Sequence, residues 1–208
     1  GGGGGSSTKI SGGTPPAEPV SPISKDIFDD IADVPWAKDA IVSLAQMNVI
    51  NGKGGMKFCP NDAITREEAV KILICAFYPE ADTVEIPFSD VDNSAWYADF
   101  IKKAYGKGIA KGINASEFGV GDSITRQDLI TLAYRAFLAK GYIEETADFS
   151  SLDTFTDKND ISDYEQTAMA SMGNAGIIQG SNGSVNPKGN ATRAEVAVMC
   201  ARMVELMK

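Results

Sequence analysis

Hydrophobic residues along this chain follow a helical spacing in six segments, which form three pairs. In the first segment of each pair, apolar side chains three or four positions apart line one stripe, as Ile41 and Leu44 do in the first pair. Such a stripe is typical of an amphipathic helix. In the second segment, apolar side chains such as Val70 and Leu73 surround most of the helix. The pattern therefore predicts three helix pairs in which the second helix is the more buried one.

Four landmarks recur in the same order in each pair. A Phe-x-Asp motif opens the unit, an aromatic residue follows, a glycine lies 16 residues after the aromatic residue, and a Thr-Arg pair comes last. The landmark residues are Asp30, Asp90 and Asp157; Trp36, Trp96 and Tyr164; Gly52, Gly112 and Gly180; and Arg66, Arg126 and Arg193. This ordered repetition predicts three copies of one structural unit, called units one, two and three below.

The repeats divide the chain into modules. We expect modules at residues 28–79, 88–139 and 155–208, with connectors at 80–87 and 140–154. One helix pair cannot bury its own apolar face, whereas three pairs can close on each other. The expected fold is therefore all-α, with three tandem helix-loop-helix repeats packed as a compact domain of pseudo-threefold symmetry. Clefts between neighbouring units are the natural ligand sites of such a domain.

The first 27 residues differ in composition from the repeats. They are rich in Gly, Ser, Thr and Pro, and such a segment cannot bury enough apolar surface to fold. We interpret residues 1–27 as a linker that joins the repeats to an upstream domain of a larger protein. A remnant of cloning is the alternative.

Charge and composition exclude several functions. The 208-residue chain carries a formal net charge of −9 and no histidine. Nucleic-acid binding needs a basic face, and no apolar run reaches the roughly 20 residues that span a bilayer, so neither nucleic acid nor membrane insertion is expected. Histidine is the commonest general base and a frequent zinc ligand. The aspartate-rich stretches lack the glycine and the final glutamate of an EF-hand loop. We expect no catalytic residue, no cofactor and no metal.

Each second helix is predicted to begin at the threonine of the Thr-Arg pair. An acidic residue follows each threonine by three positions, as Glu68 follows Thr65, and this spacing is that of a capping box. The landmark glycine, in turn, is expected to end the first helix as a left-handed cap.

The arginine that follows each threonine lies at a helix N-terminus, where a positive charge is unfavourable. Two interpretations remain open. The guanidinium grips a carboxylate or phosphate of a ligand, or it forms a salt bridge with an acidic residue of a neighbouring unit, for which Asp30, Asp90 and Asp157 are the candidates. The landmark aromatic residues likewise either stack on sugar rings or belong to the core.

The ordered landmarks resemble those of the S-layer homology family, and Thr192-Arg193-Ala194-Glu195 matches the hallmark tetrapeptide of that family. The resemblance covers about residues 28–206. It implies a secreted protein held non-covalently at the cell wall, in which grooves between modules bind secondary cell-wall polysaccharide. Pyruvate ketals are frequent on such polymers, and their carboxylates would be anionic ligands for the arginines. A helical repeat that binds a protein partner or assembles into a surface lattice is the alternative.

The resemblance also assigns the ligand-binding residues. They are the arginine of the tetrapeptide, the aspartate of the opening motif, the aromatic residue and the glycine, which are the twelve landmark positions given above. Unit two has the shorter Asp128 in its capping box, which is expected to weaken the cap. In unit three, Tyr164 replaces tryptophan and the loop after Gly180 is one residue shorter. The groove of unit three is therefore expected to bind less well than the others.

Overall fold

The computed structural model describes residues 27–208, so all but the last residue of the predicted linker lies outside the described part. Helices and short 3-10 turns are the only regular elements in this range, apart from isolated β-bridges. The α-helices are α1 (Pro35–Gln46), α2 (Arg66–Phe77), α3 (Ala98–Gly106), α4 (Arg126–Lys140), α5 (Gln166–Asn174) and α6 (Arg193–Glu205). The 3-10 helices are η1 (Ser150–Thr154), η2 (Lys158–Asp160) and η3 (Asp163–Glu165). The predicted all-α class is confirmed.

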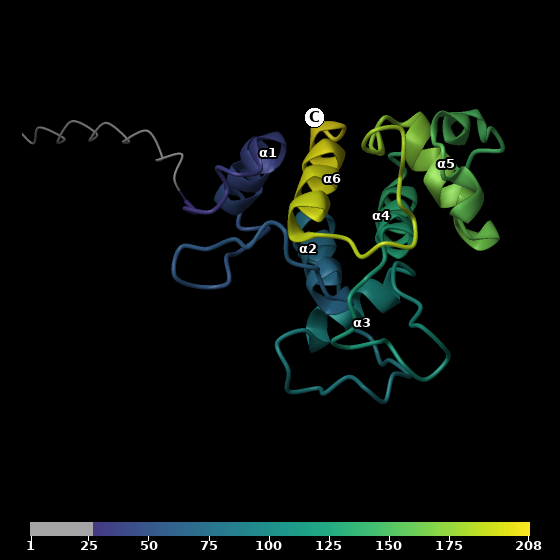
Figure 1. Cartoon of the computed structure of the whole chain (residues 1–208). Coiled ribbons are helices and arrows are strands. Elements are labelled where there is room, and N and C mark those ends of the chain that lie inside the picture. Colours follow the sequence, from purple (N-terminus) through teal and green to yellow (C-terminus); the bar gives the residue numbers. More distant parts are fainter. Residues whose placement is uncertain (1–26) are drawn as a thin grey trace, which may run out of the picture.

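The second helices of the three units form the centre of the molecule. Helices α2, α4 and α6 contact one another, and each carries a first helix on its outer side (Figure 1). These outer helices do not come from the same unit: α3 packs on α2, α5 packs on α4, and α1 packs on α6. Each first helix therefore covers the second helix of the preceding unit, and unit one closes the circle onto unit three. This arrangement confirms the predicted compact domain with pseudo-threefold symmetry.

A ring of backbone hydrogen bonds lies just before the central helices. The Ile64 N–H donates to the Ala191 carbonyl at 3.0 Å, and the Ala191 N–H donates to the Ile124 carbonyl at 2.9 Å. The Ile124 N–H closes the ring by donating to the Ile64 carbonyl at 3.0 Å. Ile64 and Ala191 are fully buried, and Ile124 is almost so. The ring satisfies backbone groups that burial would otherwise leave unpaired, and it ties all three units together.

The central helices begin at threonines, as predicted. The hydroxyls of Thr65, Thr125 and Thr192 accept hydrogen bonds from the backbone three residues later. In units one and three the glutamate completes the capping box by accepting the threonine N–H. Asp128 is too short to do so, and it instead accepts the Thr125 hydroxyl at 2.6 Å.

The prediction that the landmark glycines end the first helices is wrong. Those helices end at Gln46, Gly106 and Asn174. The left-handed residue lies two positions after each end, at Asn48 (φ 58°) in unit one, where the Val49 N–H donates to Leu44 and closes a Schellman motif. Gly108 and Gly176 are the corresponding residues of units two and three, with φ of 69° and 73°.

The landmark glycines are instead required by close packing. A Cβ on Gly52 would lie 2.6 Å from the Lys57 carbonyl oxygen and 2.7 Å from the ring of Phe28. Gly112 and Gly180 meet the equivalent carbonyl and ring at 2.5–2.7 Å. Any side chain would therefore displace the loop from the opening phenylalanine. No helix within residues 27–208 combines the length and apolar character that a membrane span needs.

Candidate binding grooves between the units

The first groove draws its lining from all three units. We define it by Gly52 of unit one, Trp96 of unit two, Arg193 of unit three, and Glu68 and Lys71 of α2. Its volume is about 160 Å³. Because α3 packs on α2 and α6 begins beside the loop of unit one, the three landmark types meet here although they are far apart in the sequence.

The second groove has the same plan with the units exchanged. It is defined by Trp36 of unit one, Arg126 of unit two, Gly180 of unit three, and Glu195 and Arg202 of α6. Its volume is larger, about 460 Å³. Isoleucine, leucine, valine and methionine side chains make up much of the remaining lining, namely Leu129, Ile130, Ile177, Ile178, Val198 and Met199.

The residues of one unit therefore do not form one site. In both grooves the arginine belongs to one unit, the glycine to the next and the aromatic residue to the one after that. The same rule, applied to the arginine of unit one, brings together Arg66, Gly112 and Tyr164. Asp128 and Thr131 of α4 belong to the same place, which we call the third junction. We expected a weaker groove in unit three, but no single groove belongs to that unit. Its landmark residues Arg193, Gly180 and Tyr164 lie at three different places.

The landmark aromatic side chains lie on the surface. Trp36, Trp96 and Tyr164 are 58%, 55% and 72% exposed, so the interpretation of these residues as core is wrong. The Lys71 ammonium lies 5.7 Å from the centre of the Trp96 ring, within the range of a cation–π contact. An exposed ring beside a cation is a suitable surface for a sugar that carries a negative charge.

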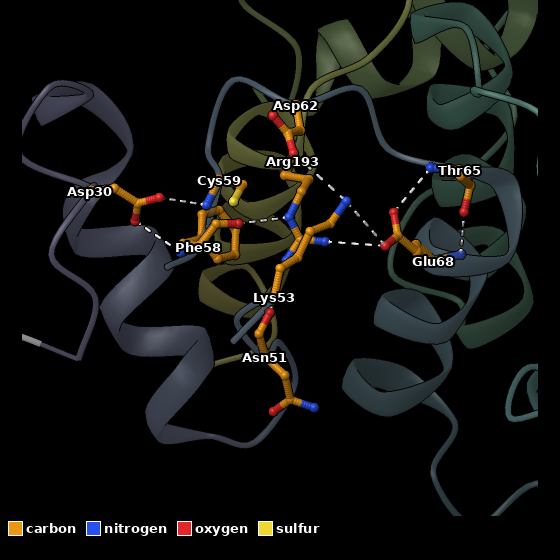
Figure 2. Close-up of polar contacts among 9 residues, drawn as sticks. All are labelled: Asp30, Asn51, Lys53, Phe58, Cys59, Asp62, Thr65, Glu68 and Arg193. Carbon is orange, nitrogen blue, oxygen red and sulfur yellow. Dashed lines mark hydrogen bonds and ion pairs between the residues drawn. The ribbon is translucent and has the colours of Figure 1, made fainter. Parts of the chain in front are cut away.

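The arginines are largely used within the protein. Figure 2 shows Arg193 between the loop of unit one and Glu68: its Nε donates to the Phe58 carbonyl at 2.8 Å, its Nη2 donates to Asn51 at 2.8 Å, and its Nη1 lies 3.6 Å from the Glu68 carboxylate. Arg193 is almost completely buried. A guanidinium bound on three sides stabilises the contact between units three and one.

The other two arginines repeat this arrangement in part. The Nε of Arg126 donates to the Val185 carbonyl at 2.6 Å, and its Nη1 forms a salt bridge with the Glu195 carboxylate. The Nε of Arg66 donates to Phe118 at 3.0 Å. A salt bridge to an acidic residue of a neighbouring unit is thus confirmed for Arg126 and Arg193. The candidate partners Asp30, Asp90 and Asp157 are wrong, because the partner is the capping glutamate of the next unit in the circle.

The landmark aspartates hold the loops that the arginines also hold. Both oxygens of Asp30 accept backbone N–H groups, from Phe58 and Cys59 at 2.8 Å (Figure 2). Burial disfavours the ionised carboxylate, but these hydrogen bonds outweigh burial and keep the pKa of Asp30 below its usual value. The N–H of Phe58 is thus bound by its own unit and its carbonyl by Arg193 of unit three.

The same aspartate contact occurs in the other units. Asp90 accepts the N–H groups of residues 118–120, and Asp157 accepts those of residues 185 and 186 and the Ser184 hydroxyl. Despite burial, the hydrogen bonds keep the pKa values of both aspartates low. The aspartates are absent from the linings of both grooves.

Three of the cations that line the grooves lie outside the repeated landmarks. Lys53 and Lys71 line the first groove and Arg202 lines the second. The residues equivalent to Lys71 in the other units are Thr131 and Val198. Because Lys53 and Lys71 each occur in one unit only, the repeat pattern does not mark them. Arg202 has a counterpart, Arg135, nine positions after the landmark arginine of unit two, and this recurrence is a signal in the sequence.

Three helix pairs closed into a circle, with an exposed tryptophan and a landmark arginine in each of two clefts between units, define a class of helical repeat domain with grooves between its copies. The chain belongs to the S-layer homology domain family, whose family model matches residues 27–70, 87–130 and 154–197. The three matches confirm the three repeats recognised in the sequence.

Several larger proteins contain a similar segment. The chain is 36% identical over 180 residues to an amylopullulanase of Thermoanaerobacterium thermosulfurigenes. The matched segment covers 86% of this chain and 9% of that protein. It is 35% identical to the exoglucanase XynX of Acetivibrio thermocellus, over 86% of this chain and 16% of that protein. It is also 33% identical to the surface-layer 125 kDa protein of Lysinibacillus sphaericus, over 82% of this chain and 14% of that protein.

The chain thus spans less than a fifth of the length of these relatives. The same kind of segment accompanies both enzymes and a surface-layer protein, so the similarity to the enzymes is limited to this segment. Family membership and the surface-layer relative place the protein at the cell surface or in the cell wall, and identify the segment as a cell-surface anchoring module.

Proposed function

We propose that this domain is a non-catalytic module that binds secondary cell-wall polysaccharide, bearing pyruvate ketals, and so anchors a larger surface protein. The observation that carries the proposal is that two inter-unit grooves each place an exposed tryptophan beside cationic side chains. An indole ring packs well against the C–H face of a pyranose. The cations supply the attraction for an acidic substituent.

The charge of the first groove supports an anionic ligand. Lys53, Lys71 and Arg193 face it, against the single carboxylate of Glu68, although the whole chain has a net charge of −9. Because salt screens the net charge of the protein over about 10 Å, a local positive site attracts a carboxylate at contact although the whole chain is negative. A ketal carboxylate on a sugar that stacks on Trp96 fits this arrangement.

The landmark residues then have different roles in binding. The aromatic residues contact the sugar, and the glycines keep the loop of the groove close to the opening phenylalanine. Arg193 already uses its three nitrogens within the protein, so Lys71 is the direct partner of the carboxylate in the first groove. The arginines and aspartates hold the groove walls in place.

A pull-down with cell-wall sacculi tests the proposal. The wild-type domain should sediment with sacculi and should lose most of this retention when the secondary polymer is chemically stripped. The Trp36→Ala and Trp96→Ala double variant should bind at least about tenfold more weakly, in line with stacking losses of about 1–3 kcal/mol. Tyr105→Ala is the matched control, because Tyr105 is an exposed aromatic side chain that lines neither groove.

Equal retention on stripped walls would overturn the proposal. In that case, self-association of the domain in solution would favour assembly into a surface lattice instead.

A further inference from the structure

Glu165 occupies an unusual position at the third junction. It ends η3, directly after Tyr164, and only 1% of its surface is exposed. The equivalent residues of the other units are Ala37, which is fully buried, and Tyr97. Unit three therefore places an ionisable carboxyl group where unit one has a methyl group.

The surroundings of Glu165 do not provide a full set of partners. Asp128, Thr131 and Arg135 of α4 face it, and Tyr164 and Arg66 belong to the same charged cluster. Within residues 27–208, the buried Oε2 of Glu165 and the buried Oγ1 of Thr131 have no hydrogen-bond partner. Such unpaired buried atoms are uncommon and costly.

The state of this carboxyl group depends on burial and on Asp128. Burial, followed by the repulsion from Asp128, raises the pKa of Glu165 to about 8, while Arg135 acts in the opposite direction. At pH 7 the group is mostly neutral and lies against the Asp128 carboxylate without repulsion. Above pH 8 Glu165 is mostly ionised and faces the Asp128 carboxylate, and Arg135 is the cation that favours the ionised form.

The other polar link at this junction does not titrate. The Gln127 side-chain amide donates to the Ser162 hydroxyl at 3.0 Å, and its oxygen accepts the Ser162 N–H at 3.2 Å. Because neither side chain ionises, these two hydrogen bonds do not themselves change between pH 6 and 9. We therefore attribute a change in the junction between pH 6 and 9 to Glu165.

We propose that Glu165 is a proton-dependent latch, which holds η3 and the start of α5 against α4 while it is protonated and weakens that contact when it ionises. The site is built into one junction of three. The junctions that form the first and second grooves have no buried glutamate at the equivalent place, so they lack this latch. Alkaline pH should loosen unit three alone.

Amide hydrogen exchange at pH 6.5 and pH 9.0, corrected for the intrinsic rate at each pH, tests the latch. In the wild type, protection of the amides in 163–174 should fall on the order of tenfold or more between the two values, since the open state binds the Glu165 proton far less tightly. In Glu165→Gln, which keeps the shape and cannot ionise, protection should change little.

Glu67→Gln is the matched control, because Glu67 is a buried glutamate on α2 whose carboxylate accepts the Gly121 N–H at 3.1 Å. It should leave the pH dependence of 163–174 as in the wild type. The same pH dependence in wild type and Glu165→Gln would overturn the proposal. If the variant fails to fold, NMR titration of the wild type decides: amide shifts in 163–174 that follow the Glu165 carboxyl carbon with a midpoint near 8 support the latch, and amides that stay unchanged while this carboxyl titrates refute it.

Discussion

At the scale of single residues, the repeated polar side chains have mainly internal partners. The N–H of Phe58 binds Asp30 and its carbonyl binds Arg193, so one residue joins two units. The sequence made the arginine and the aspartate equally conspicuous, because both recur at fixed spacing. It did not show that they bind the two polar groups of the same residue, since this depends on which units are neighbours in space.

Arg193→Ala should therefore destabilise the domain more than it weakens any ligand contact. The change removes two hydrogen bonds from a charged, buried donor and leaves the carbonyls of Phe58 and Asn51 without those partners. We expect a loss of about 3 kcal/mol in the free energy of unfolding, measured by urea denaturation. Lys71→Ala is the comparison variant, with an expected change below about 0.5 kcal/mol. Equal stability of both variants would show that Arg193 is not structural.

The pKa of Asp30 gives a prediction about acid stability. Because the folded protein keeps this pKa below the ordinary value of 3.8, the carboxylate contributes stability above that value and loses the contribution as the pH falls through the folded pKa. Asp30→Asn should be less stable than the wild type at pH 7, and the difference should shrink as the pH falls below 3.8. Denaturation at several pH values measures it, and a constant difference would argue against this role for the charge.

At the scale of elements, the helical stripes and the capping threonines were sufficient to place all six helices. The starts of the central helices could be predicted because a threonine and an acid recur at three-residue spacing. The ends of the outer helices could not, because unit one uses Asn48 where the other units use Gly108 and Gly176. Because this position is asparagine in one unit and glycine in the other two, it does not stand out as a repeat. The landmark glycines recur in all three units, and the helix ends were therefore predicted too far along the chain.

Two glycines of unit two separate close packing from backbone strain. Gly112 and Gly108 both have positive φ, 79° and 69°. A methyl group on Gly112 would lie 2.5–2.7 Å from neighbouring atoms, whereas Gly108 faces open space. Gly108→Ala should cost about 1 kcal/mol for the left-handed backbone. Gly112→Ala should cost about 2 kcal/mol more, because the methyl group also collides with the loop. Equal melting temperatures for the two variants would contradict the packing role.

At the scale of the whole molecule, the circular order of packing decides which residues meet. The sequence predicted three units with pseudo-threefold symmetry, and the structure has them. It did not predict that each outer helix covers the preceding unit, with α1 on α6, because hydrophobic stripes do not specify their partners. The grooves therefore combine Arg193, Gly52 and Trp96 in one place and Arg126, Gly180 and Trp36 in another.

Each groove is built from three units, and we propose that it binds an anionic sugar. NMR titration with a methyl hexoside that carries a pyruvate ketal tests it most directly, in the wild type and in Lys71→Ala. We expect the NMR signals of the Gly52 amide and the Trp96 indole to shift together. Lys71→Ala should remove both responses, while those of Gly180 and Trp36 remain. Joint shifts of Gly52 and Trp36, the pair from unit one, with Trp96 unaffected by Lys71→Ala, would contradict it.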